Sequence, residues 1–185
     1  MKIFQKGFNY SQDGPGNRLV YHLKGCNFRC LWCSNPEGLE PEGGIIYTPD
    51  EMVREILRAR PMFFDGGGVT FTGGECTLQF DELLYVLKNV RKEGINTAIE
   101  TNGSHVRLPE LSLYVDCLMM DVKHVDPGIH KEQTGADVAN TLNNYKILAK
   151  TGPLHVRIPL IKHFNSEDGE RFGDFFEKYG TDDCD

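Results

Sequence analysis

Short apolar segments alternate with amphipathic helical patterns along most of this 185-residue chain, and this alternation restricts the fold more than any other feature. Each apolar segment is bounded by glycine or polar residues and is typical of a strand. The segments span residues 18–23, 68–72, 95–100, 116–122 and 154–160. Alternating strands and helices predict an α/β fold whose parallel sheet has right-handed crossovers and is either open or curled toward a barrel.

Three helices with recognisable ends are predicted between these strands. Thr48 and Glu51 form a capping box, and Pro49 occupies the first helical position. A second helix ends at Gly94, and a third spans about residues 138–150. The apolar stripes of the first two helices consist of Met52, Val53, Ile56, Leu57, Leu83, Leu84, Leu87 and Val90.

Composition excludes several classes of function. A net charge of −7 argues against nucleic acid or an anionic membrane as the main partner. No apolar stretch has the length of a membrane span, and the N-terminus lacks the apolar core of a signal peptide, so a cytoplasmic location is expected. The length suits one compact domain covering residues 1–185. The partner is expected to be a protein or a small molecule.

The polar segments that follow the five strands are where chemistry is expected. In parallel α/β folds the loops at the carboxyl ends of the strands carry the functional residues. These segments read KGCNFRCLWCSNPE, GGECT, TNG, KHVDPGIH and IKHFNSED. We therefore expect all five to share one face of the molecule.

The first of these segments holds three cysteines, Cys26, Cys30 and Cys33, in the spacing Cys-x3-Cys-x2-Cys. Three thiolates around one centre suit an iron-sulfur cluster or zinc. A structural zinc site needs a fourth ligand, and no second ligand pair of suitable spacing exists. The remaining cysteines stand apart at positions 76, 117 and 184, so a [4Fe-4S] cluster with one iron open to a further ligand is the favoured interpretation.

The spacing, with Trp32 before the third cysteine, resembles the signature of the radical S-adenosylmethionine superfamily. Further segments resemble successive motifs of glycyl radical enzyme activating enzymes, of the pyruvate formate-lyase activating type. These segments are DGPGNR (13–18), TGGECTLQ (72–79), ETNG (100–103), MDVKHVD (120–126) and HVRIPLIKHFN (155–165). The resemblance implies a partial (β/α) barrel of radical SAM type.

The resemblance also implies the cofactors and the residues that hold them. The three cysteines are the expected catalytic cluster ligands, and S-adenosylmethionine is expected to chelate the open iron. Gly73, Gly74 and Glu75 match the GGE motif, in which Glu75 would accept from the methionyl ammonium. Trp32, Cys33 and Ser34 would approach the adenine, although a core position for the only tryptophan competes with this role.

The fourth strand contributes Asp121, Val122 and Lys123 to the expected cofactor site. Lys123 would pair with the methionyl carboxylate. The alternative without a function is that Asp121 and Lys123 form a surface ion pair that contributes little to stability. By resemblance, Glu100, Thr101, Met119 and Asp121 would bind a small monovalent cation. The family usually has aspartate at position 100, so Glu100 is a departure that bears on this cation site.

The implied partners are a glycyl radical enzyme as protein substrate and a flavodoxin- or ferredoxin-like reductant, with the chain itself a monomer. Ser11, Gln12 and Asp13 are the expected contacts to the substrate loop, with His124 and Val125 as weaker candidates. Residues 34–75 contain no cysteine, so one cluster and no ferredoxin-like insert are expected.

Relatives usually continue into a strand with a histidine-containing LLPYH-like segment, whereas this sequence stops at TDDCD. Either the chain is truncated or its barrel is shortened there, and cofactor binding would be weaker or less shielded.

Two other functions remain open from the residues. One is a radical SAM enzyme acting on a small molecule, such as a deazapurine precursor. The other is a non-catalytic binding module stabilised by zinc or a cluster, which the missing fourth ligand disfavours.

Overall fold

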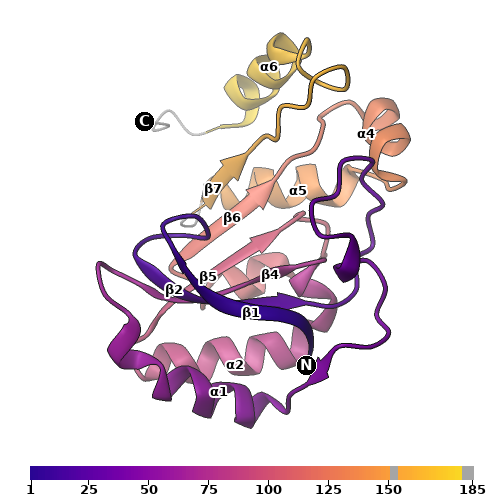
Figure 1. Ribbon diagram of the computed structural model, residues 1–185. Coiled ribbons are helices and arrows are strands. Elements are labelled where there is room, and N and C mark those ends of the chain that lie inside the picture. Colours follow the sequence, from indigo (N-terminus) through magenta and orange to yellow (C-terminus); the bar gives the residue numbers. More distant parts are fainter. Residues whose placement is uncertain (151–153, 181–185) are drawn as a thin grey trace.

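A mostly parallel seven-stranded sheet forms the centre of the computed structural model, which describes residues 1–150 and 154–180 (Figure 1). The strand order is β3-β1-β2-β4-β5-β6-β7. Strands β2, β4, β5, β6 and β7 are parallel neighbours, whereas β1 is antiparallel to both β2 and β3. The strands are β1 (Lys2–Tyr10), β2 (Asn17–Leu23), β3 (Ile45–Ile46), β4 (Gly68–Gly73), β5 (Asn96–Thr101), β6 (Cys117–Asp121) and β7 (Leu154–Arg157). The five predicted strands and their parallel arrangement are confirmed.

All helices but the last lie in connections between strands, and α1 and α2 lie side by side against one face of the sheet (Figure 1). The capping box of α1 is confirmed, because Thr48 Oγ1 accepts from Glu51 N and the Glu51 carboxylate accepts from Thr48 N. The helices are α1 (Pro49–Arg58), α2 (Phe80–Lys92), α3 (Leu108–Ser112), α4 (Pro127–Thr134), α5 (Ala139–Leu148) and α6 (Gly169–Tyr179). The helix predicted over residues 138–150 is α5.

The two faces of the sheet differ in character because successive strand side chains point to opposite sides. One face packs against α1 and α2 and forms the main hydrophobic core. It includes the fully buried side chains of Tyr21, Phe71 and Ile99. The other face carries polar side chains, among which Ala98, Cys117 and Met119 form a small separate apolar cluster. Hydrophobic burial therefore fixes the helix side and leaves the polar side for ligands.

Several elements were missed from the sequence, each for a physical reason. In β1 only Ile3 is buried, so its sequence lacks the alternation of a half-buried strand. In α4 the buried residues are polar or titratable, and the helix is fixed instead by the Asp126 carboxylate, which accepts from Gly128 N and Ile129 N. In α6, Phe172 and the later aromatic residues follow helical spacing, so the sequence does carry a signal for this helix.

The last strand is shorter than predicted. The predicted segment ran to residue 160, whereas β7 ends at Arg157, two residues before a proline that has no N–H for strand pairing. The strand pairs in register with β6, with Asp121 opposite Arg157. Cys184 lies outside the described residues.

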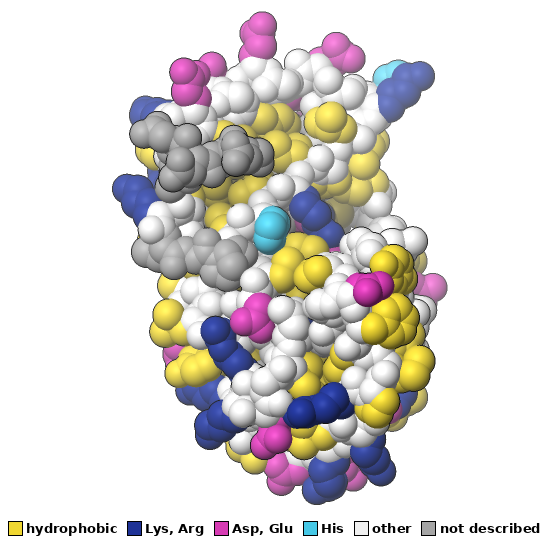
Figure 2. Space-filling view, turned by 90° about the vertical axis from the view of Figure 1, so that its left-hand side faces the viewer, with side chains coloured by type: hydrophobic (Ala, Val, Ile, Leu, Met, Phe, Trp, Pro, Cys, Tyr) yellow, Lys and Arg dark blue, Asp and Glu magenta, His cyan; other side chains and the backbone are white. Residues whose placement is uncertain are grey.

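The surface carries charged side chains of both signs. Figure 2 shows basic and acidic side chains intermingled on one face of the molecule, without a continuous basic stripe. Within the described ranges, no helix has the length and apolar character needed to cross a membrane.

Candidate active site

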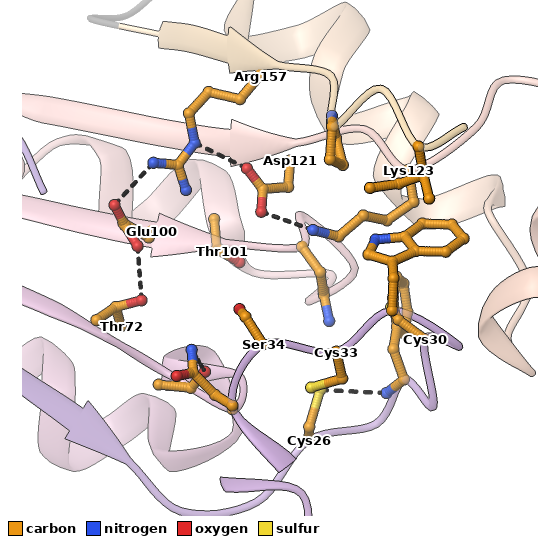
Figure 3. A pocket seen from close by; sticks show the side chains of 18 residues that line it. Cys26, Cys30, Cys33, Ser34, Thr72, Glu100, Thr101, Asp121, Lys123 and Arg157 are labelled. Carbon is orange, nitrogen blue, oxygen red and sulfur yellow. Dashed lines mark hydrogen bonds and ion pairs between the residues drawn. The ribbon is translucent and has the colours of Figure 1, made fainter. Parts of the chain in front are cut away.

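A cavity of about 390 Å³ lies at the carboxyl ends of the parallel strands, and segments following all five of them contribute to its lining. Its volume is in the range that holds a small organic ligand. The shared face expected for the five loops is therefore observed. The predicted site residues that line the cavity are Cys26, Cys30, Trp32, Cys33, Ser34, Gly73, Gly74, Glu100, Thr101, Asp121 and Lys123. Figure 3 shows the labelled members facing one another across it.

The cysteine loop is held in place by backbone hydrogen bonds at its start and between its first two cysteines. Near its start, Gly25 N donates to Gly38 O (2.8 Å). Further along, Arg29 N donates to Thr134 O (2.7 Å) at the carboxyl end of α4. The buried Phe28 ring meets the His130 ring of α4 edge-on, with 5.2 Å between centroids. Helix α4, absent from the sequence prediction, thus supports the loop that carries the thiols.

The three thiols are half-buried and face one cavity, as cluster ligands require. Burial raises the pKa of the Cys26 thiol to about 11 and also raises the pKa of Cys30. Metal binding must therefore displace their protons, because the thiolate is the ligand. No group of three or more His, Cys, Asp or Glu side chains in the described part of the chain is arranged to hold a single metal ion. Three convergent thiols suit a cluster with one open iron, whereas a structural zinc site would need a fourth protein ligand.

The glycines after β4 let the cysteine loop approach the strand end. Gly73 has φ +117°, a conformation that residues with a side chain rarely adopt. A Cβ on Gly74 would collide with the carbonyl oxygens of Gly25 and Gly38. These two positions therefore require glycine, which explains the GG part of the motif by close backbone approach.

Glu75 is placed differently from the expectation. Its side chain is 1% exposed and does not line the cavity. Oε1 accepts from Thr77 N (3.0 Å), Thr77 Oγ1 (2.5 Å) and Thr101 Oγ1 (2.7 Å), and Oε2 accepts from Asn102 N (2.7 Å). Burial raises the pKa of this carboxyl, and these four donors counteract the rise. The arrangement does not offer the carboxylate to an ammonium, because the side chain is buried away from the cavity and joins the ends of β4 and β5.

A chain of ion pairs crosses the opposite wall of the cavity (Figure 3). Lys123 Nζ donates to Asp121 Oδ2 at 2.7 Å. Arg157 Nε donates to Asp121 Oδ1, and Arg157 Nη1 donates to Glu100 Oε1, both at 2.8 Å. Thr72 Oγ1 donates to the second Glu100 oxygen at 2.7 Å. The Asp121–Lys123 pair therefore belongs to a network inside the cavity, which excludes the simpler reading as an isolated surface pair.

Trp32 lies at the rim of the cavity rather than in the core. It is half-buried, and its ring contacts that of Phe164 at a centroid distance of 5.4 Å. The core position considered from the sequence is therefore wrong, whereas a wall for a flat heterocycle remains compatible with the geometry. Ser34 is exposed and lies next to it on the cavity lining.

Some predicted residues do not reach the cavity. Val122 is fully buried in the core, and Met119 lies beneath the lining on the polar face of the sheet. His124 is also fully buried, against Phe172, and Val125 packs on the core. A direct contact of Val122 or His124 with a ligand is therefore not provided, because side-chain burial removes both from the surface.

Ser11, Gln12 and Asp13 lie in the turn between β1 and β2, at the amino ends of the parallel strands. The turn leans over the polar face of the sheet, since Thr70 Oγ1 donates to the Asp13 carbonyl at 2.7 Å. The structure thus places this turn and the cavity at opposite ends of one sheet face.

Arg157 is the main site residue that the sequence did not reveal. It lines the cavity and links two of the predicted residues. A signal was available, because in-register pairing of the last two predicted strands sets position 157 beside Asp121. Arg18, 0% exposed, was also missed; its Nε donates to Thr70 Oγ1 at 2.6 Å, and burial lowers its pKa to about 10.

Comparisons with known proteins agree with this geometry. Residues 20–176 match the profile of the radical SAM superfamily. The chain is 42% identical over 126 residues to the pyruvate formate-lyase-activating enzyme of Clostridium pasteurianum, covering 66% of this chain and 52% of that protein. It is 33% identical over 177 residues to the pyruvate formate-lyase 1-activating enzyme of Escherichia coli K12, covering 91% of this chain and 72% of that protein.

A solved structure is also similar. The crystal structure of a domain of pyruvate-formate lyase-activating enzyme from Bacteroides vulgatus has a TM-score of 0.56 and 28% sequence identity. The match covers 61% of this chain and 73% of that domain. The profile match, the sequence relatives and the convergent cysteine loop all agree, and the chain belongs to the radical SAM superfamily, among the pyruvate formate-lyase-activating enzymes.

Proposed function

We propose that this chain is a radical SAM activase that generates a glycyl radical on a partner enzyme of the pyruvate formate-lyase type. The observation that best supports this proposal is a cavity in which three thiols face Gly73, Gly74 and Lys123. Its relatives bear the name of this activity, and the chain spans 52% of one and 72% of another. The proposal covers one core domain with one cluster and no ferredoxin-like insert.

The thiols of Cys26, Cys30 and Cys33 would hold a [4Fe-4S] cluster, leaving one iron for S-adenosylmethionine. When bound together, the cluster and S-adenosylmethionine supply the one-electron cleavage that produces a hydrogen-abstracting radical. The protein's part is to bind and orient these groups and to exclude water. The cysteine loop does this by its anchoring to η1 (Pro36–Gly38) and to α4.

The ligand's charged groups have partners on opposite walls. Lys123, whose side chain is 15% exposed, donates one proton to Asp121 and would pair with the methionyl carboxylate through its remaining protons. The strand end at Gly73 and Gly74 presents backbone to the methionyl ammonium, since the Glu75 carboxylate is committed elsewhere. Trp32 and Ser34 at the rim would receive the adenine.

The partner's glycine loop would enter along the polar face of the sheet. This face runs from the turn at Ser11, Gln12 and Asp13 to the cavity. Val125, half-buried two residues after Lys123, would contact the same loop outside the cavity. A flavodoxin- or ferredoxin-like reductant, a monomeric state and a cytoplasmic location belong to the same proposal.

The test is anaerobic reconstitution followed by incubation with dithionite and S-adenosylmethionine. The wild-type chain should bind about four irons, as one [4Fe-4S] cluster requires, and release 5′-deoxyadenosine. Cys30→Ser should bind less iron and release no 5′-deoxyadenosine. Cys117→Ser changes a thiol outside the cavity and should behave as wild type. A colourless protein carrying one zinc ion would overturn the proposal.

A further inference from the structure

The residues that the family resemblance marks as ligands of a monovalent cation have side chains that already contact other groups in this chain. Arg157 contacts three of the four: Nη1 lies 2.8 Å from Glu100 Oε1 and 3.9 Å from Met119 Sδ, and Nε lies 2.8 Å from Asp121 Oδ1. The fourth, Thr101, donates its hydroxyl proton to Glu75 and accepts from Gly103 N at 3.0 Å. The guanidinium thus stands where the cation was expected.

No carboxylate oxygen of the expected cation site is left without a partner. The second Glu100 oxygen accepts from Thr72 Oγ1, and the second Asp121 oxygen accepts from Lys123 Nζ, both at 2.7 Å. A sodium or potassium ion would have to displace at least one of these charge-assisted bonds.

Charge balance leads to the same conclusion. Two carboxylates, Glu100 and Asp121, face two cationic side chains, Lys123 and Arg157, so the network is neutral. The guanidinium of Arg157, like that of any arginine, stays charged. A further cation would be repelled by it at close range in a partly desolvated site.

The backbone explains why this arginine reaches both carboxylates. Arg157 pairs with Asp121 across β6 and β7, and Glu100 pairs with Met119 across β5 and β6. The long arginine side chain therefore passes over Met119 to meet Glu100. A glutamate at position 100 extends one methylene further toward the guanidinium than an aspartate would.

We propose that the Arg157 guanidinium replaces the monovalent cation, holding Glu100 and Asp121 in place so that this chain binds S-adenosylmethionine without a bound metal cation. The identity of the ligand rests on the proposed function. Arg157 is a positioning residue in this scheme, because it acts through the two carboxylates and Lys123.

The experiment compares S-adenosylmethionine affinity of the reconstituted protein in potassium chloride, sodium chloride and N-methylglucamine chloride at equal ionic strength. Wild-type affinity should differ by less than about twofold among the three salts, since coupled ligands typically alter affinity by about 5- to 150-fold. Arg157→Met leaves two carboxylates with one cationic partner, and its affinity should become at least about fivefold higher with potassium or sodium than with N-methylglucamine.

Arg54→Met is the matched control, because it removes an exposed arginine on α1, away from the cavity. It should remain salt-insensitive. A fivefold or larger salt preference in the wild type would overturn the proposal, and that measurement needs no variant to fold. Salt-insensitive binding by a folded Arg157→Met protein would overturn it as well. If the guanidinium occupies the place of a cation, its removal must let potassium or sodium bind there and strengthen S-adenosylmethionine binding.

Direct cation binding separates this inference from the proposed function. Thallium-205 NMR with Tl⁺ as a potassium substitute should detect no specific site on the wild type and one site on Arg157→Met. If the protein bound no S-adenosylmethionine, the proposed function would fail, but the thallium measurement would still decide the cation question. A specific thallium site on the wild type contradicts the inference.

Discussion

Replacing Glu75 with glutamine should destabilise the whole protein, because this buried carboxylate joins two strand ends. Four donors converge on it, three on Oε1 and one on Oε2. A glutamine amide can keep its oxygen toward the three donors, but its NH2 group then meets the Asn102 N–H. One buried donor pair is left unsatisfied, which costs about 1–3 kcal/mol.

The remaining bonds also weaken, since each loses the roughly 1 kcal/mol by which a charged acceptor exceeds a neutral one. Relief from burying a charge offsets part of this loss. We expect Glu75→Gln to lower the free energy of unfolding by about 2–4 kcal/mol, a large share of the 5–15 kcal/mol typical of a domain. The assay is urea denaturation of the metal-free protein, with the midpoint and slope fitted together.

Glu132→Gln is the control, because Glu132 is exposed on α4 and should change stability by less than about 0.5 kcal/mol. The reasoning is refuted if Glu75→Gln unfolds within 0.5 kcal/mol of wild type but loses affinity for S-adenosylmethionine. That result would mean that Glu75 acts mainly on the ligand's ammonium and that its four donors matter little.

Three further predictions concern positions that support the site. Gly74→Ala should destabilise the protein by about 1–3 kcal/mol and lower its iron content, because cysteine-loop carbonyls fill the space that its Cβ needs. Gly7→Ala is the control, since open space surrounds the position of its Cβ, and it should be neutral or stabilising. Thr48→Ala should cost about 1 kcal/mol in urea denaturation by removing the α1 cap and leave iron binding intact. Backbone hydrogen bonds from Ile129 and Gly128 lower the pKa of Asp126, so its stabilisation of α4 is present above the carboxyl's ordinary pKa and is lost as pH falls through the lowered value. Amide hydrogen exchange in α4 should quicken over that acidic range in the wild type, and Asp126→Ala should abolish this pH dependence; equal behaviour of the two proteins would contradict it.

The parallel part of the fold could be predicted because burial leaves a strong trace in the sequence. Strands such as β4 are covered on both faces, so nearly every residue is apolar or small, and α1 carries both a capping box and an apolar stripe. In contrast, β1 is largely exposed and α4 buries polar residues, so neither leaves a hydrophobic period to read. The end of β7 lies just before Pro159, which has no N–H to pair with a neighbouring strand.

The candidate site was predictable to the extent that chemistry resides in residue types. The cysteine loop and the acidic and basic residues at the carboxyl ends of β5 and β6 were expected together, and they line one cavity. Which side chains form hydrogen bonds and ion pairs with one another was not predictable, because this depends on strand register and on side-chain reach. Glu75 turns away from the cavity toward four donors, and Arg157 reaches two carboxylates from the neighbouring strand.

The central claim is that this chain makes a glycyl radical on a protein. The most direct measurement incubates the reconstituted protein, dithionite and S-adenosylmethionine with a pyruvate formate-lyase, followed by electron paramagnetic resonance. The account predicts the doublet of a glycyl radical, which should disappear when the accepting glycine of the partner is replaced by alanine. Release of 5′-deoxyadenosine without any doublet across a panel of glycyl radical enzymes would contradict the account and point to a small-molecule substrate.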